Sequence, residues 1–173
     1  KEEAVGGLSI EQAACLSDAD IAALTGILVG VVSAGASVGF VPPLSPDEAA
    51  AYWRDVLKPG CVLLPARRDG EIVGTGQLDL AMRPNGRLRA EVRKVLVSVD
   101  AQGQGIGKAL MAALETAARA EGRSLLHLDT NSDDTSNRLY LSMGYTAAGT
   151  IPNWAVDADG TPHPTTFYYK VLE

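Results

Sequence analysis

The stretch VLVSVDAQGQGIG, Val95 to Gly107, decides the fold of this chain. Its β-branched run predicts the end of a strand, its spaced glycines predict a tight loop, and an apolar-striped helix begins inside that loop. Backbone N–H groups in the first turn of a helix have no internal partners, and the helix dipole adds positive potential there. Gly103 and Gly105 lack Cβ, so a ligand can come close to the main chain. The stretch therefore predicts a site for a phosphate-bearing cofactor.

Three phosphate-binding loops compete for this stretch. The nucleotide P-loop requires G-x-x-x-x-G-K-[ST], but Gln102 stands at its first position and an alanine at its last. The dinucleotide fingerprint G-x-G-x-x-G would start at Gly103, yet Lys108 occupies its third glycine position. Asp129, an acid at the end of the next apolar strand, keeps the dinucleotide alternative open. A third pattern, Q/R-x-x-G-x-G/A, matches from Gln102 to Gly107 without a mismatch.

Composition limits the class of protein. At 173 residues the chain has the size of one domain, which we expect to cover residues 1–173. The net charge of −6 argues against a nucleic-acid partner and suits an amine substrate. Glycines and serines interrupt the charge-free segment 21–46, so we expect a core helix and a loop there and no membrane partner. Cys15 and Cys61 lack metal-ligand spacing, which predicts buried reduced thiols, no metal and a cytoplasmic location.

Periodicity and turn signals predict the elements on either side of the loop. Ser17 and Ser45 are N-cap candidates, and Glu48 completes a capping box with Ser45. The Asp69-Gly70 pair predicts a hairpin turn. The expected strands are 8–10, 61–66, 72–80, 89–99, 124–129, 145–151 and 165–172, and the expected helices are 17–31, 45–56, 106–121 and 133–143. Because this order does not alternate throughout, it weakens the doubly wound, dinucleotide-binding alternative.

From Val92 to Tyr169 the chain resembles the GNAT superfamily of N-acetyltransferases. The motifs that carry the resemblance are the loop Gln102–Gly107 and the segment Asn137–Tyr140 followed by Gly144-Tyr145. The resemblance implies an α/β (mixed α+β) GNAT fold, with a central, mostly antiparallel mixed sheet of six to seven strands and about four helices. Shorter segments, among them 35–40 and 159–165, are similar to the tabtoxin-resistance type, which acetylates a small toxin that carries an α-amino acid group.

The resemblance also implies acetyl-CoA as the cofactor. In the superfamily the loop N–H groups hold the pyrophosphate, the preceding strand offers its backbone to the pantetheine amides, and the second motif contacts the cofactor arm and sulfur. Carried onto this chain, the cofactor-binding residues are Val95, Leu96, Val97, Gln102, Gly103, Gln104, Gly105, Ile106, Gly107, Lys108, Asn137 and Tyr140. Gln102 stands where arginine is commoner, and Lys108 is the candidate to replace the missing positive charge.

Glu91 is the first candidate base. It lies on the strand that leads into the loop, and period-2 alternation puts it on one face with Arg93, Val95 and Val97. Acetyl transfer needs an amine in its free-base form, and a carboxylate in a partly desolvated cleft can accept the amine's proton. A salt bridge to Arg93 is the structural alternative for Glu91.

Asp129 and Tyr140 complete the predicted catalytic set. The resemblance implies a second base or an amine anchor at Asp129, whereas an acid at a strand end also caps a following turn. Tyr140 is implied as the acid that protonates the departing thiolate, against the alternative of a core tyrosine. Residues 33–40 are expected to form a substrate-side wall. Trp154 is interpreted either as a core residue or as part of a loop that closes over the cleft.

These observations predict an enzyme that moves acetyl from acetyl-CoA directly to a primary amine of a small molecule. Neither cysteine lies in a motif with histidine, so no acyl-enzyme is expected. A toxin, an antibiotic, an amino acid, a polyamine and a protein N-terminus all stay open as acceptors, and a homodimer is expected by analogy with the family. Two alternatives are a non-catalytic acyl-CoA-binding sensor and a nicotinamide-dependent oxidoreductase, the second opposed by Lys108 and by the strand order.

Overall fold

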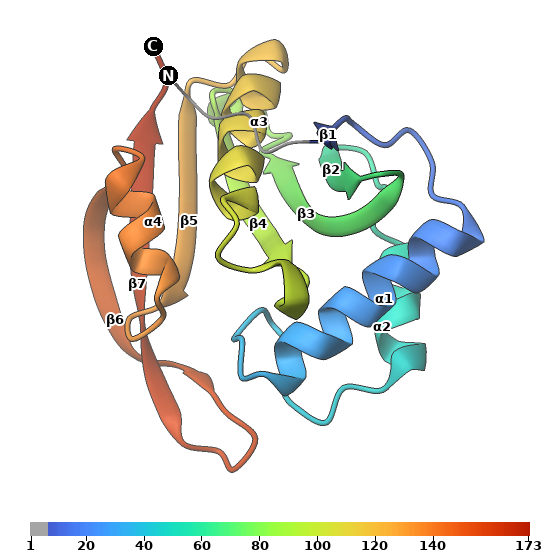
Figure 1. Cartoon of the computed structure of the whole chain (residues 1–173). Helices are drawn as coiled ribbons and strands as arrows, with labels where there is room; N and C mark the ends of the chain where they lie inside the picture. Colours follow the sequence, from blue (N-terminus) through green and yellow to red (C-terminus); the bar gives the residue numbers. More distant parts are fainter. Residues whose placement is uncertain (1–6) are drawn as a thin grey trace.

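The computed structural model describes residues 7–173, which form one seven-stranded sheet covered by helices on both faces (Figure 1). The strand order is β1-β2-β3-β4-β5-β7-β6, and all neighbours are antiparallel except β4 and β5. The elements are β1 (Leu8–Ile10), α1 (Asp18–Ser33), α2 (Pro46–Arg54), β2 (Cys61–Arg68), β3 (Glu71–Leu80), β4 (Arg89–Val97), α3 (Ile106–Ala120), β5 (Leu125–Asn131), α4 (Ser136–Ser142), β6 (Thr146–Val156) and β7 (Pro162–Val171). The expected fold class and element order are confirmed.

Residues close to one another in the sequence determine where the helices α1 and α2 begin and where the chain turns between β2 and β3. Ser17 and Ser45 cap α1 and α2, each within a complete capping box. Asp69 and Gly70 have φ values of 52° and 87°, and a tight hairpin turn needs positive φ at both of its central residues. The caps and the hairpin are therefore as predicted, and β2 and β3 extend up to the turn.

The core lies in two layers, one on each face of the sheet. Leu63 of β2 packs with Leu24 and Leu28 of α1, whereas its neighbours Val62 and Leu64 pack in the cluster that contains the buried face of α3. This alternation is the period of two expected for a strand covered on both sides. The helices α1 and α2 thus cover one face, and α3 covers the other.

Strands β4 and β5 run parallel at the centre of the sheet and separate part way along. Their pairing ends at Glu91 and His127, although β4 continues to Val97 and β5 to Asn131. Beyond that pair the facing edges of the two strands no longer hydrogen-bond to each other. The separation opens the middle of the sheet and leaves main-chain groups along its walls.

A β-bulge in β4 lies at this opening. The register against β3 shifts so that Lys94 and Val95 together stand opposite Gly76, and Lys94 has a φ of 49°. An extra residue changes which side chains share a face. The prediction that Glu91 shares a face with Val95 and Val97 is therefore wrong, because both valines pack toward α3, on the side opposite Glu91.

Four further predictions need correction. The strand expected to end at 151 continues to Val156, because a register shift lets Pro152 sit in an edge strand. Trp154 therefore lies on β6 and not in a loop or the core. The helix expected from 133 starts only at Ser136, since Asn131 and Asp134 side chains accept from backbone N–H groups two residues ahead. Cys15, expected to be buried, is exposed.

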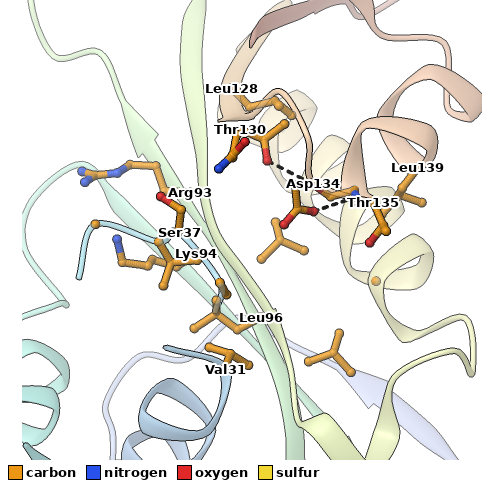
Figure 2. Close-up of a pocket in the computed structure, with 18 of the residues that line it drawn as sticks. Val31, Ser37, Arg93, Lys94, Leu96, Leu128, Thr130, Asp134, Thr135 and Leu139 are labelled. Atoms are coloured by element: carbon orange, nitrogen blue, oxygen red, sulfur yellow. Dashed lines mark hydrogen bonds between the residues drawn. The ribbon is translucent and has the colours of Figure 1, made fainter. Parts of the chain in front are cut away.

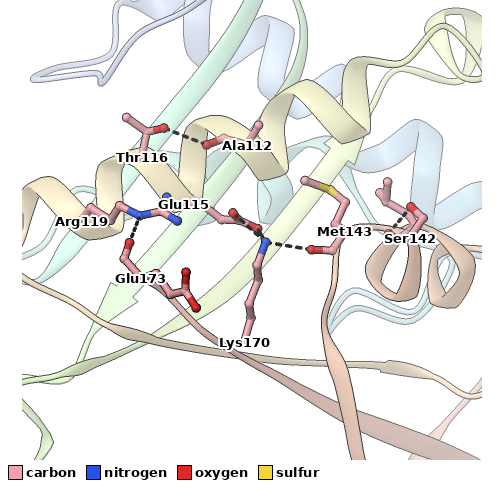
Figure 3. A network of polar contacts seen from close by, with 9 residues as sticks. Ala112, Glu115, Thr116, Arg119, Ser142, Met143, Lys170 and Glu173 are labelled. Carbon is pink, nitrogen blue, oxygen red and sulfur yellow. Dashed lines mark hydrogen bonds and ion pairs between the residues drawn. The ribbon is translucent and has the colours of Figure 1, made fainter. Parts of the chain in front are cut away.

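A polar network joins α3, α4 and β7 behind the opening (Figure 3). The Lys170 ammonium donates to both carboxylate oxygens of Glu115, at 2.8 and 2.9 Å, and to the Met143 carbonyl at 2.8 Å. The Glu115 side chain is only 10% exposed, so the pair is largely shielded from water. The contact fixes the end of α4 relative to α3. None of the helices within residues 7–173 is long and apolar enough to cross a membrane.

Candidate active site

The separation of β4 and β5 holds a cleft of about 890 Å³ (Figure 2). The loop after α1, residues 34–41, forms one wall, as expected for the segment 33–40, and the start of α4 forms the other. The Gly-rich loop closes one end, and β6 adds Trp154, which is 53% exposed and packs edge-on against Phe167. Elements far apart in the chain therefore meet around one elongated opening.

The Gly-rich end of the cleft has the geometry of an anion cradle. Gly103 and Gly105 have φ values of 74° and 80°, in the left-handed region that favours glycine. Gly105 is the N-cap of α3, and no side chain within residues 7–173 caps that helix. Its first N–H groups are therefore free to bind a ligand, with the helix dipole adding positive potential. A Cβ on Gly103 would meet no atom within 4 Å, so the loop is also open to the cleft.

The loop divides between residues that line the cleft and residues that face away. Gln102, Gly103, Gly105, Ile106 and Gly107 line it. Gln104 does not, because its side chain accepts from Arg68 at 2.6 Å and donates to the Asp100 carbonyl at 3.3 Å. Lys108 is exposed on α3 and does not line the cleft.

Arg68 is a cation beside the loop that the sequence did not predict. Its guanidinium reaches the loop through Gln104. The residue lies at the end of β2, far from the loop in sequence, and only the sheet brings the two together.

The strand edge beside the loop is suited to an extended ligand. Val95, Leu96 and Val97 line the cleft, and their backbone is bonded to β3 on one side only. An extended chain with amide groups can add to such an edge as an extra strand. The Gln102 side chain already donates to the Val97 carbonyl at 3.2 Å, so this hydrogen bond orients the loop against the strand.

Asn137 is not brought into the cleft. Its amide nitrogen donates to the backbone carbonyls of Asn131 at 2.9 Å and Asp134 at 2.6 Å, and its oxygen accepts from the Tyr168 hydroxyl at 2.6 Å. The side chain is absent from the residues that line the opening. In this structure Asn137 therefore holds the turn between β5 and α4, rather than facing the space for a cofactor arm.

Tyr140 lies on α4 and lines the cleft, although it is only 8% exposed. Its ring packs against the rings of Tyr145 and Tyr168. Burial raises the pKa of Tyr140 to about 12, against a smaller lowering by a hydrogen bond with Ser136. The hydroxyl is therefore protonated at neutral pH and available as a donor.

Two carboxylates reach the cleft near the point where β4 and β5 separate. Asp129 lies on β5 just past the last pair, and burial raises the pKa of its carboxyl, opposed by the charges of Arg93, His127 and Lys94. Glu91 belongs to the last pair itself, and its carboxylate lies 3.8 Å from Arg93 Nε. The structure thus brings both predicted acids to one site, with Asp129 the less tightly engaged of the two.

Lys94 is a cleft residue whose role the sequence did not predict. The bulge turns its side chain under the loop after α1, where its ammonium lies 5.5 Å from the ring centre of Phe40 and 5.3 Å from that of Tyr52. Burial, and secondarily the charge of Arg93, lowers the pKa of Lys94 to about 8. In a regular strand the adjacent side chains of Arg93 and Lys94 would point to opposite faces of the sheet. The β-bulge brings both to the same side, so alternation alone could not predict that Lys94 lines the cleft.

The chain belongs to the acetyltransferase (GNAT) family, whose pattern matches residues 21–145. It is 32% identical over 155 residues to phosphinothricin N-acetyltransferase from Alcaligenes faecalis, an alignment that covers 84% of this chain and 77% of that relative. An acetyltransferase candidate from Salmonella typhimurium, solved with its cofactor acetyl-CoA, superposes with a TM-score of 0.79 at 25% identity, covering 97% of this chain and 95% of that one.

The fold is also that of a GCN5-related N-acetyltransferase from Kribbella flavida, with a TM-score of 0.79 at 24% identity over 96% of this chain and 98% of that structure. With the family established, the chain is an acetyl-CoA-dependent N-acetyltransferase. The nicotinamide alternative is overturned, because neither the mixed sheet nor the family supports it.

Proposed function

We propose that this enzyme transfers acetyl directly from acetyl-CoA to the primary amine of a small molecule, with toxins or antibiotics that carry an α-amino acid group as the leading acceptor class. The observation that carries the proposal is Asp129, a carboxylate of raised pKa in the same cleft as the protonated Tyr140. The name of the Alcaligenes faecalis relative, phosphinothricin N-acetyltransferase, supports the acceptor class.

Residues of this chain fit acetyl-CoA at two places. The N–H groups of Gly103 to Gly107 suit its pyrophosphate, and the free edge from Val95 to Val97 suits its amide-containing arm. When bound, the cofactor supplies an activated acetyl thioester. The side chains of Gln104, Lys108 and Asn137 do not line the cleft, so Gln104 enters the proposed cofactor set through its backbone N–H alone, and Lys108 and Asn137 fall outside that set.

Proton transfer is assigned to side chains of β4, β5 and α4 that line the same cleft. Asp129 accepts a proton from the incoming ammonium, and Glu91 is the second candidate for that role. Tyr140 holds the proton that the leaving thiolate takes up. Neither Cys15 nor Cys61 lines the cleft, and burial raises the pKa of the Cys61 thiol to about 11, which supports transfer without an acyl-enzyme.

Release of free CoA thiol in the presence of a panel of amines tests the proposal. We expect thiol release that depends on both acetyl-CoA and the amine, with intersecting initial-velocity lines of a sequential mechanism. Parallel lines would refute direct transfer. Tight acetyl-CoA binding without thiol release from any amine would favour the acyl-CoA-binding sensor. A homodimer is the expected assembly, which sedimentation velocity checks.

A further inference from the structure

The Lys94 ammonium has no anionic partner within residues 7–173, although its surroundings are rich in charge. It forms no ion pair and no hydrogen bond with a described residue, and its contacts are the faces of Phe40 and Tyr52. The other two lysines that lie near a carboxylate, Lys58 and Lys170, are both paired. A cation between two rings in a cleft is desolvated, so an anionic ligand gains more from it than from a surface lysine.

The neighbouring cation, Arg93, is already neutralised. Its guanidinium lies 2.7 Å from Asp79 and 3.8 Å from Glu91. Asp79 is in turn held by Gln77 at 2.7 Å, and Gln77 accepts from the Tyr52 hydroxyl at 2.8 Å. These contacts hold the Arg93 guanidinium against its two acidic partners. Lys94 therefore provides the positive charge in this part of the cleft that can pair with a ligand.

Lys94 and the proposed base occupy one cleft. Lys94 lies on β4 under the loop of residues 34–41, beside Arg93 and Ser37 (Figure 2), whereas Asp129 lies on the diverging β5. Both side chains line this cleft, and the charge of Lys94 lowers the pKa of the Asp129 carboxyl against the larger effect of burial. The cleft therefore offers a cation and a carboxylate to the same acceptor, an arrangement complementary to a molecule with both charges.

We propose that Lys94 binds a carboxylate or similar anionic group of the acceptor, so that the substrate is a zwitterion whose amine faces Asp129. The inference rests on the proposed function and narrows it: alkyl amines and polyamines, which lack the anion, are poor acceptors. Lys94 is then a specificity-determining residue, because it selects among amines without taking part in proton transfer.

Binding to such an anchor has a defined pH dependence. Burial, and secondarily the charge of Arg93, lowers the pKa of Lys94 to about 8, while the carboxylates of Asp79, Glu91 and Asp129 act in the opposite direction. Burial raises the pKa of the neighbouring Tyr52 to about 12, so its hydroxyl stays neutral over this pH range. The ammonium is charged below that value and lost above it. KM for a zwitterionic acceptor therefore rises as the pH passes through about 8.

Lys94→Met tests the inference, because methionine keeps the length of the side chain and its contact with the two rings. Phosphinothricin and the standard L-amino acids are assayed beside their α-carboxamides, with thiol release as the readout. We expect the acids to be preferred by the wild type, and Lys94→Met to raise their KM by roughly 10- to 100-fold, the value of a charge-assisted contact, with kcat little changed. Lys58→Met, an exposed lysine outside this cleft, is the matched control.

The outcomes separate the two proposals. Equal losses for acids and carboxamides in Lys94→Met, or a wild type that prefers the carboxamides, would overturn the role of Lys94. If no amine is acetylated, the proposed function fails, and the same pairs are titrated by calorimetry into the complex with CoA. Tighter binding of acids than carboxamides, lost in Lys94→Met, would then support the anchor, and no difference would overturn it.

Discussion

Replacement of Asp129 by asparagine removes the proposed base with little change in shape. The carboxyl lies just past the last β4–β5 pair, and burial raises its pKa, so it is a stronger base than a surface aspartate. General-base catalysis contributes roughly 10²–10⁴-fold, so we expect kcat/KM for the acceptor to fall by about 10³-fold at neutral pH. Acetyl-CoA binding should not change, because its proposed contacts lie elsewhere in the cleft.

The pH dependence of Asp129→Asn distinguishes a base from a binding group. An α-amino group has a pKa of about 8, so only about a tenth of it is free base at pH 7. Without an internal base only that fraction reacts, and log kcat/KM should rise with unit slope until the pH reaches the pKa of the amine. The wild-type profile should flatten at lower pH, once Asp129 is ionised, because the enzyme then removes the proton itself.

Thiol release measured across this pH range is the assay, with Asp55→Asn as the control, since Asp55 lies on the surface in an exposed ion pair with Lys58. If Asp129→Asn keeps the wild-type pH profile, Asp129 is not the base, whatever the rate of the variant. If Glu91→Gln shows the unit slope and Asp129→Asn does not, the base is Glu91. Its carboxylate, which lies 3.8 Å from Arg93 Nε, would then have to reach the amine from beside that guanidinium.

Three other substitutions probe separate parts of the molecule. Tyr140→Phe should lower kcat by on the order of 10²-fold and leave acetyl-CoA affinity unchanged in calorimetry, because a thiolate is a fair leaving group even without an acid. Gly105→Ala should cost about 1–2 kcal/mol of stability in thermal unfolding, since φ is 80° there, and should also weaken acetyl-CoA binding; unaltered affinity would remove the cradle from the cofactor site. Glu115→Gln leaves the Lys170 ammonium without its carboxylate and should cost about 1–3 kcal/mol in denaturant unfolding, less than for a fully buried pair. If acceptor KM changed in Glu115→Gln while stability did not, the pair would have a role beyond the scaffold.

The features that sequence predicted correctly are those set by neighbouring residues. Ser45 and Glu48 satisfy the free N–H groups of one helix end by themselves, and Asp69-Gly70 supplies the two positive φ values of one turn. Gly103 and Gly105 supply the positive φ values of the predicted tight loop after β4 in the same local way. Such motifs need no tertiary contact to be recognised, which is why the strand–loop–helix unit and the order of elements follow from the sequence.

The features that sequence missed depend on packing between distant segments. Gly76 lies opposite the bulge, and a Cβ there would stand 2.8 Å from Leu114 Cδ1, so the strand geometry is coupled to the close approach of α3. The motif predicts Asn137 as a cofactor-binding residue. Its side chain instead hydrogen-bonds to Asp134 and Tyr168, in a turn that forms only when β7 is in place. Strict alternation was the wrong rule for β4 because it assumes an unbroken strand.

The bulge puts the edge that we propose for the cofactor and the cation that we propose for the acceptor on one strand. Before it, Glu91 and Arg93 face the side of α1 and α2; after it, Val95 and Val97 pack toward α3. Lys94, the extra residue, is therefore displaced toward the acceptor side just where the strand edge becomes free for an extended ligand. A regular strand would keep the alternation of side chains and would not add Lys94 to the same wall as Arg93. The positive charge that we assign to recognition of the acceptor thus exists because the strand is irregular at the point where β4 and β5 separate.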